Sequence, residues 1–290
     1  MRLTWRPAQA YLTGLPVAGT RKPVSTRAMH TLPLAQRDDL GNGYHVLWFD
    51  SEVPVAASAG QFTMVRASNW GEAPLLPRPM SLLSGGRRPS MLIKVVGEGT
   101  RRMAQDPMGQ AYNLLAPLGH PWTPLPAGHR PVLVAGGVGV APLVYLAEEL
   151  RAAQGVLAPM SLYGGRTARD LPLAERLEAC GELAVTTEDG SRGTEGRVTV
   201  LLDELLAKAA GCGDKLAVYT CGPHGMMRAV AERAEAAGVW CRASLEAPMG
   251  CGYGVCLGCP VAKRDGSYFY TCVDGPCVDA KHVDWTKEVF

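Results

Sequence analysis

Cysteine is crowded into one end of this chain, and no other feature restricts its possible folds as strongly. Of the nine cysteines in 290 residues, five lie within the last 40 positions. Four of these are spaced C-x4-C-x2-C-x12-C, at Cys251, Cys256, Cys259 and Cys272. Such an uneven distribution argues against a disulfide framework for the whole protein and favours a local metal site.

The spacing of the first three cysteines is that of plant-type [2Fe–2S] loops. Glycines interleave them, and glycine lets a chain curl closely enough to offer backbone N–H groups to the sulfurs of a cluster. Structural zinc is the main alternative, although zinc ribbons usually pair two C-x2-C units and this tail has one. Unligated or disulfide-bonded cysteines are a third possibility, and Cys277 is a rival to Cys272 as fourth ligand.

Composition and charge exclude several classes of protein. With 47% hydrophobic and 19% charged residues, the chain is expected to fold rather than to remain disordered. A net charge of +2 is too small to favour nucleic acid or an anionic membrane as the main partner. No apolar run approaches the roughly 20 residues that a membrane-spanning helix needs. We therefore expect a cytoplasmic protein.

The first 28 residues are basic and contain no acidic residue. This composition favours a loosely ordered extension. A transit peptide is the alternative, although the segment lacks the apolar core of a secretory signal.

Residues 29–128 have the pattern of a small antiparallel β-barrel. Short apolar runs are separated by Gly and Pro turns, without helical spacing. The predicted strands are Tyr44–Phe49, Gln61–Arg66, Ser90–Val96 and Ala111–Leu115. Prolines then crowd between positions 117 and 131, which indicates a domain boundary.

Residues 129–243 alternate predicted strands with predicted helices, from Pro131–Ala135 to Trp240–Ser244. This alternation is typical of a parallel sheet covered by helices on both faces. The expected fold class is therefore a β-barrel plus an α/β domain, followed by a small cysteine-rich domain at residues 244–290.

Two short motifs in the barrel region favour a bound flavin when they are taken together. In an R-P-x-S sequence, Arg78 offers a bidentate grip for a phosphate and Ser81 offers a hydroxyl to a flavin ring. A Gly-x-Gly-Thr turn follows, in which N–H groups and the hydroxyl of Thr100 are placed to contact a diphosphate. Either motif alone is more often an ordinary turn.

Two turns in the α/β region are candidates for a nicotinamide dinucleotide site. The first contains Gly137 and Gly139 between a strand and a helix, where a pyrophosphate meets helix N–H groups. Pro142 breaks the usual G-x-G-x-x-G spacing. The second turn is Cys221, Gly222 and Pro223, at the end of another strand. Cys221 either lies against the nicotinamide or is simply a small residue in a tight turn. Arg166 either contacts the 2′-phosphate of NADP or lies in solvent, so the sequence leaves the choice between NAD and NADP open.

The order of these motifs, ending in Ser244-Leu245-Glu246 and the cysteine loop, resembles the ferredoxin-reductase-type electron-transfer subunit of bacterial dihydroorotate dehydrogenase. The resemblance covers roughly residues 29–276. It implies an FAD-binding barrel, an NAD-binding α/β domain and a [2Fe–2S] loop. The implied cluster ligands are Cys251, Cys256, Cys259 and Cys272. The implied FAD-binding residues are Arg78, Pro79, Met80, Ser81, Leu92, Ile93, Lys94, Gly99 and Thr100.

The resemblance also implies a partner. In that family, two such subunits join a dimer of an FMN-containing catalytic subunit, which makes a heterotetramer that oxidises dihydroorotate to orotate. Electrons would pass from FMN through the cluster and FAD to NAD, and no side chain needs to act as nucleophile or general base. The chain departs from the family in its basic extension, in Cys277 and in a tail with His282 and Trp285.

Two other functions compete with this one. The first is a related relay that serves a sulfite reductase, a hydrogenase or a ferredoxin–NADP transhydrogenase. The second is a zinc-binding interaction module without catalytic activity.

Overall fold

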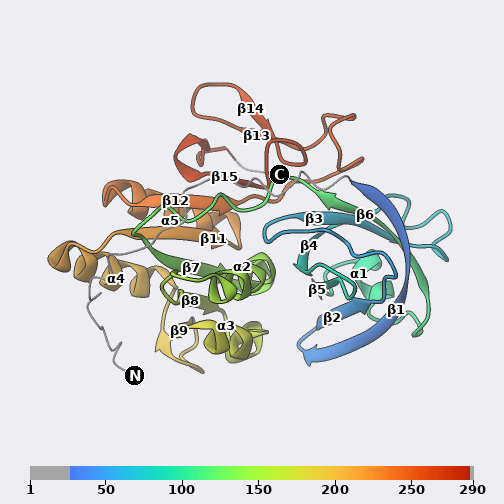
Figure 1. Ribbon diagram of the computed structural model, residues 1–290, viewed down its shortest axis with the longest axis horizontal. Helices are drawn as coiled ribbons and strands as arrows, with labels where there is room; N and C mark the ends of the chain where they lie inside the picture. The colour runs from blue at the N-terminus through green and yellow to red at the C-terminus, as the bar shows by residue number, and fades with distance from the viewer. Residues whose placement is uncertain (1–26, 288–290) are drawn as a thin grey trace.

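The computed structural model describes residues 27–287, so nearly all of the basic extension expected for residues 1–28 lies outside the described residues. Figure 1 shows a barrel on one side, a helix-covered sheet on the other, and the C-terminal segment lying along both. Within the described part of the chain, no helix combines the length and apolar character needed to cross a membrane.

The barrel is closed by six strands in the order β1-β2-β5-β4-β3-β6, and all neighbouring pairs are antiparallel. The strands are β1 (Ala28–Gly41), β2 (Tyr44–Phe49), β3 (Phe62–Ala67), β4 (Arg78–Ser84), β5 (Ser90–Lys94) and β6 (Ala111–Leu118). Helix α1 (Glu98–Met103) follows β5. The predicted barrel is confirmed, but the sequence patterns did not indicate β1 or β4.

The second part is a seven-stranded sheet in the order β10-β9-β8-β7-β11-β12-β15. Its first six strands run parallel, as predicted. They are β7 (Arg130–Gly136), β8 (Met160–Gly165), β9 (Glu182–Thr187), β10 (Thr194–Glu195), β11 (Leu216–Cys221) and β12 (Trp240–Ser244). The helices are α2 (Val140–Ala152), α3 (Ala174–Cys180), α4 (Thr199–Cys212) and α5 (His224–Ala236), with 3-10 turns η1 (Gly137–Gly139) and η2 (Ala168–Asp170).

Alternation along the central strand β7 explains why helices cover both faces of the sheet. Val132 and Val134 belong to the apolar cluster that contains residues of α4 and α5. Leu133 and Ala135 point to the opposite face and belong to the cluster with residues of α2 and α3. A strand that is apolar at every position buries both of its faces, so helices must cover both.

The C-terminal segment is attached to both parts. Its strands are β13 (Pro260–Ala262), β14 (Tyr268–Tyr270) and β15 (Cys277–Asp279), and it ends in the 3-10 turn η3 (Ala280–His282). β15 pairs antiparallel with β12 and so becomes an edge strand of the main sheet. Gly252 in the cysteine loop packs against Met64 of the barrel. The cysteine loop is therefore held between the barrel and the sheet.

The barrel and the α/β part also share a buried apolar cluster. Tyr44 and Leu92 from the barrel pack in the same cluster as Leu143 and Val144 from α2. Because apolar side chains bury most area when they pack without gaps, this shared cluster fixes the barrel against the first βα unit. The walls of a site between the barrel and the α/β part are therefore fixed relative to each other by this cluster.

Candidate functional site

A pocket of about 430 Å³ opens where the three parts of the chain meet. The barrel, the turn between β7 and α2, and the segment before the cysteine loop each contribute part of its wall. Its lining residues are Phe62, Pro79, Met80, Ser81, Leu92, Ile93, Lys94, Val96, Thr100, Val138, Ala141, Leu245, Glu246, Ala247, Pro248, Met249 and Pro276. The wall is mostly apolar with a few polar groups, which is typical of a cofactor pocket.

Seven of the nine residues predicted to bind FAD line this pocket, and the other two lie beside it. Arg78 crosses directly over Gly99, where an added Cβ would come within 2.7 Å of the arginine Nε. The hydroxyl of Thr100 already accepts hydrogen bonds from the N–H groups of Val96 and Gly97, at 3.1 and 3.3 Å. The Thr100 hydroxyl therefore shapes the turn around it.

The glycine turn predicted for a dinucleotide forms the wall opposite the barrel. Gly137 has a φ of +53°, a left-handed conformation that favours glycine. Val138 and Ala141 line the pocket. Gly139 lies against the second predicted turn, since a Cβ there would come within 2.6 Å of the carbonyl group of Cys221 and of the Cα of Gly222. The structure therefore brings the two predicted turns into direct contact.

Cys221, at the end of β11, is buried and does not line the pocket. Burial raises the pKa of the thiol, with a smaller contribution from the negative charge of Glu246. In the conformation described, the Cys221 side chain is buried behind the turn and Pro223 is the exposed member of this motif, so contact between Cys221 and a nicotinamide stays a prediction.

Residues 245–249 form a wall of the pocket that the sequence analysis did not assign. The signal was present, since Ser244-Leu245-Glu246 carried part of the resemblance, but nothing in the sequence placed it against the barrel. Glu246 is exposed at the pocket wall, and the protein packed closely around it raises the pKa of its carboxyl. This segment leads within two residues from Met249 to Cys251.

The four predicted cluster cysteines come together as two pairs. The sulfur atoms of Cys259 and Cys272 are 3.2 Å apart, although 12 residues separate them in sequence. The backbone N–H of Cys256 lies 3.5 Å from the sulfur of Cys251. Among residues 27–287 no three His, Cys, Asp or Glu side chains converge as ligands of a single metal ion.

This pairing fits a two-iron cluster, because each iron of a [2Fe–2S] centre takes two thiolates besides the bridging sulfides. Backbone N–H groups of Tyr253 and Cys272 also approach sulfurs of the loop, each at 3.5 Å. Burial opposes ionisation of Cys251, but N–H donors led by that of Cys256 outweigh it and lower the pKa of Cys251 to about 6. A thiol with a low pKa is readily available as a thiolate ligand.

Cys277, the rival fourth ligand, lies elsewhere. It begins β15, and its sulfur lies 3.6 Å from the carbonyl oxygen of Gly60 in the barrel part. Burial raises its pKa well above the usual value, so it is a packing thiol. This placement supports Cys272 as the fourth ligand.

Two known families match segments of the chain that carry these features. The family described as "Iron-sulfur cluster binding domain of dihydroorotate dehydrogenase B" matches residues 246–284. The family described as "Oxidoreductase NAD-binding domain" matches residues 133–232. The first match contains all four paired cysteines, and the second contains both turns of the α/β part.

Whole-chain relatives agree with these matches. The chain is 37% identical over 234 residues to the "Dihydroorotate dehydrogenase B (NAD(+)), electron transfer subunit" of Caldanaerobacter subterraneus, covering 79% of this chain and 86% of the relative. It is 39% identical over 247 residues to the probable electron transfer subunit of the same enzyme in Methanopyrus kandleri, covering 84% and 85%.

Solved structures show the same fold. The structure described as "Insights into flavin-based electron bifurcation via the NADH-dependent reduced ferredoxin-NADP oxidoreductase structure" matches with a TM-score of 0.77 at 28% identity, covering 89% of this chain and 91% of that one. The ferredoxin reductase of carbazole 1,9a-dioxygenase shares the fold at 19% identity, with a TM-score of 0.65 and coverage of 75% and 68%. With relatives above 30% identity of which it covers about 85%, the chain belongs to the family of dihydroorotate dehydrogenase B electron transfer subunits.

Proposed function

We propose that this chain relays electrons between an FMN-containing dihydroorotate dehydrogenase subunit and NAD, through its own [2Fe–2S] cluster and FAD. One observation carries the proposal. A single pocket is walled by the predicted flavin residues, by the glycine turn of the α/β part and by the segment that enters the cysteine loop. A flavin in this pocket would have a nicotinamide site on one side and an iron site on the other.

The residues present fit these groups. The R-P-x-S strand and Leu92–Lys94 would hold FAD, and the paired cysteines would hold the cluster. Bound FAD supplies the ability to exchange a hydride with a nicotinamide and single electrons with an iron–sulfur centre. The protein's own task is to place these groups close together and to keep water away. The apolar lining, including Phe62, Leu92 and Leu245, suits that task.

The partner-binding surface is best placed around the cysteine loop. Val255 and Leu257, on either side of Cys256, are 72% and 54% exposed, and Tyr253 and Val273 are also exposed beside cluster cysteines. Apolar side chains gathered on one surface loop mark a protein–protein contact. A catalytic subunit that docked here would bring its flavin near the cluster, which a one-electron relay requires.

The test is reconstitution of the full chain with its FMN-containing partner. The purified protein is expected to contain FAD, iron and acid-labile sulfide, and the pair together should reduce NAD with electrons from dihydroorotate. A related relay for another enzyme would contain the same cofactors but would not support that reaction. A colourless protein without iron or flavin would contradict the proposal as a whole.

Leu257→Asp is expected to weaken binding of the catalytic subunit about 10- to 100-fold, because it places a charge in an apolar contact. Leu257 has a φ of +55°, which aspartate tolerates better than most residues, so the substitution adds little backbone strain. Binding is measured by titrating the catalytic subunit against the labelled chain, with iron content as a check on the loop.

Leu157→Asp provides the matched control. Leu157 is 48% exposed in the connection between α2 and β8, away from the cysteine loop in sequence. The same substitution at this position should leave the affinity unchanged. Equal weakening by both variants would argue against a docking surface at the cysteine loop.

We further propose that the protein works in the cytoplasm, where thiols stay reduced. The four cysteines of the loop must stay reduced to ligate a cluster as thiolates, which a reducing compartment allows.

A further inference from the structure

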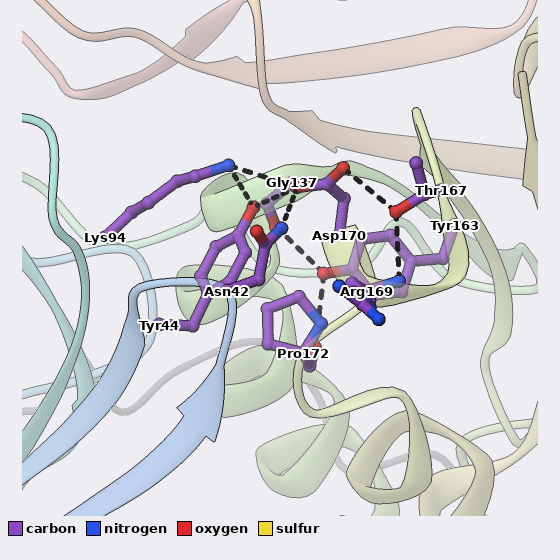
Figure 2. Close-up of polar contacts among 9 residues, drawn as sticks. All are labelled: Asn42, Tyr44, Lys94, Gly137, Tyr163, Thr167, Arg169, Asp170 and Pro172. Atoms are coloured by element: carbon purple, nitrogen blue, oxygen red, sulfur yellow. Dashed lines mark hydrogen bonds and ion pairs between the residues drawn. The ribbon is translucent and has the colours of Figure 1, made fainter.

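A polar network crosses the boundary between the barrel and the α/β part (Figure 2). Tyr44 of β2 and Lys94 of β5 are direct partners across adjacent strands. The ammonium group of Lys94 donates to the Tyr44 hydroxyl at 2.9 Å and to Oδ1 of Asp170 at 3.1 Å. Asp170 belongs to η2, so a carboxylate of the α/β part holds a lysine of the barrel.

One oxygen of Asp170 accepts from three groups of the barrel. Besides Lys94, it accepts from the side-chain amide of Asn42 at 2.9 Å and from the Tyr44 hydroxyl at 3.3 Å. The Asp170 side chain is only 14% exposed. Burial alone would raise the pKa of Asp170, but the hydrogen bond and charge of Lys94 outweigh burial and lower it. The carboxylate therefore stays ionised and paired.

The network touches both predicted cofactor sites. Lys94 lines the pocket on the flavin side. The Tyr44 hydroxyl lies 3.7 Å from the position that a Cβ on Gly137 would occupy. The Tyr163 hydroxyl also approaches this turn, and its single proton is shared between the carbonyl oxygens of Gly137 at 2.9 Å and Pro172 at 3.1 Å (Figure 2). Gly137 thus lies near hydroxyls from the barrel and from the sheet.

We propose that Asp170 is a positioning residue for hydride exchange, acting through Lys94 and Tyr44 to fix the glycine turn relative to the flavin pocket. This inference rests on the proposed function, because it takes the pocket as the flavin site and the turn as the nicotinamide site. With FAD and a nicotinamide bound, a hydride would pass between them with both of its electrons. Asp170 neither gains nor loses a proton in that step.

The test is Asp170→Asn in the full chain with its flavin and cluster in place. The amide keeps an oxygen that can accept from Asn42 and Tyr44, but it removes the charge that holds Lys94. The limiting rate of flavin reduction by NADH, measured by anaerobic stopped flow, should fall about 10- to 100-fold, as a misplacement of reacting groups by an ångström does. Flavin content and the equilibrium affinity for NAD⁺ should change less than about threefold, because the binding contacts themselves remain.

A double-mutant cycle separates this role from general support of the fold. If Asp170 acts through Lys94, Asp170→Asn combined with Lys94→Met should be no slower than the slower single variant, since coupled residues are not additive. Asp170→Glu keeps the charge and should restore part of the rate. It also serves as the second variant if Asp170→Asn does not fold.

Tyr145→Phe is the matched control. It removes a hydrogen bond of 2.8 Å from α2 to the carbonyl oxygen of Ala57, across the same boundary but apart from Lys94. This variant should reduce its flavin at the unmodified rate. An unchanged rate in Asp170→Asn, equal slowing in Tyr145→Phe, or additive losses in the double variant would overturn the proposal. Failure of the proposed function looks different, because then the unmodified protein either would not show flavin reduced by NADH or would show it without reducing NAD from dihydroorotate in the presence of the FMN-containing partner.

Discussion

Replacement of Cys256 by serine is expected to remove the iron–sulfur cluster while FAD stays bound. Cys256 is an exposed member of the cysteine loop, and a serine hydroxyl is a harder and far less acidic ligand than a thiolate. Iron and acid-labile sulfide should fall close to zero, together with the visible absorption of the cluster. NADH should still reduce the flavin, but electron transfer from the catalytic subunit should be lost.

Cys212→Ser is the matched control, because Cys212 is an exposed cysteine at the end of α4, outside the loop. It should keep full iron content. Retention of the cluster in Cys256→Ser would show that the ligand set is wrong. Loss of FAD with an intact cluster would contradict the assignment of the barrel to the flavin.

Gly139→Ala is expected to slow flavin reduction by NADH about 100-fold, the size of effect that follows from misplaced reacting groups. The added methyl would meet the backbone of Cys221 and Gly222 at 2.6 Å. Since backbone atoms cannot rotate away as a side chain can, the two turns must separate, at a cost of about 1–3 kcal/mol in stability. Stopped-flow reduction and thermal unfolding measure the two effects.

Gly225→Ala is the control for this substitution. Gly225 lies in the first turn of α5, where an added Cβ would meet nothing within 4 Å. Alanine favours a helix over glycine, so this variant should be at least as stable as the unmodified chain and should reduce flavin normally. A fast and stable Gly139→Ala would show that contact between the two turns is not needed.

Much of the architecture is predictable because its signals are local. Each strand of the α/β part from β7 to β12, apart from the two-residue β10, coincides with an apolar run, and each of its helices follows with helical spacing. The strands that were missed carry weaker signals. β1 is polar towards its end. β4 begins with the R-P-x-S motif, whose proline indicates a turn. In the closed barrel these segments pair with neighbouring strands, and their own composition does not predict that pairing.

The amino-acid sequence by itself determined the kinds of groups this protein brings together: four spaced thiols, a flavin motif and two turns that contain glycine, each encoded within one short segment. Only the tertiary structure decided which of them meet. It placed Cys272, and not Cys277, beside Cys259. It also placed residues 245–249 in the pocket wall and paired Lys94 with Asp170. The reason is physical, because a motif depends on local backbone geometry, whereas contacts between distant segments depend on how the barrel and the sheet pack their apolar faces.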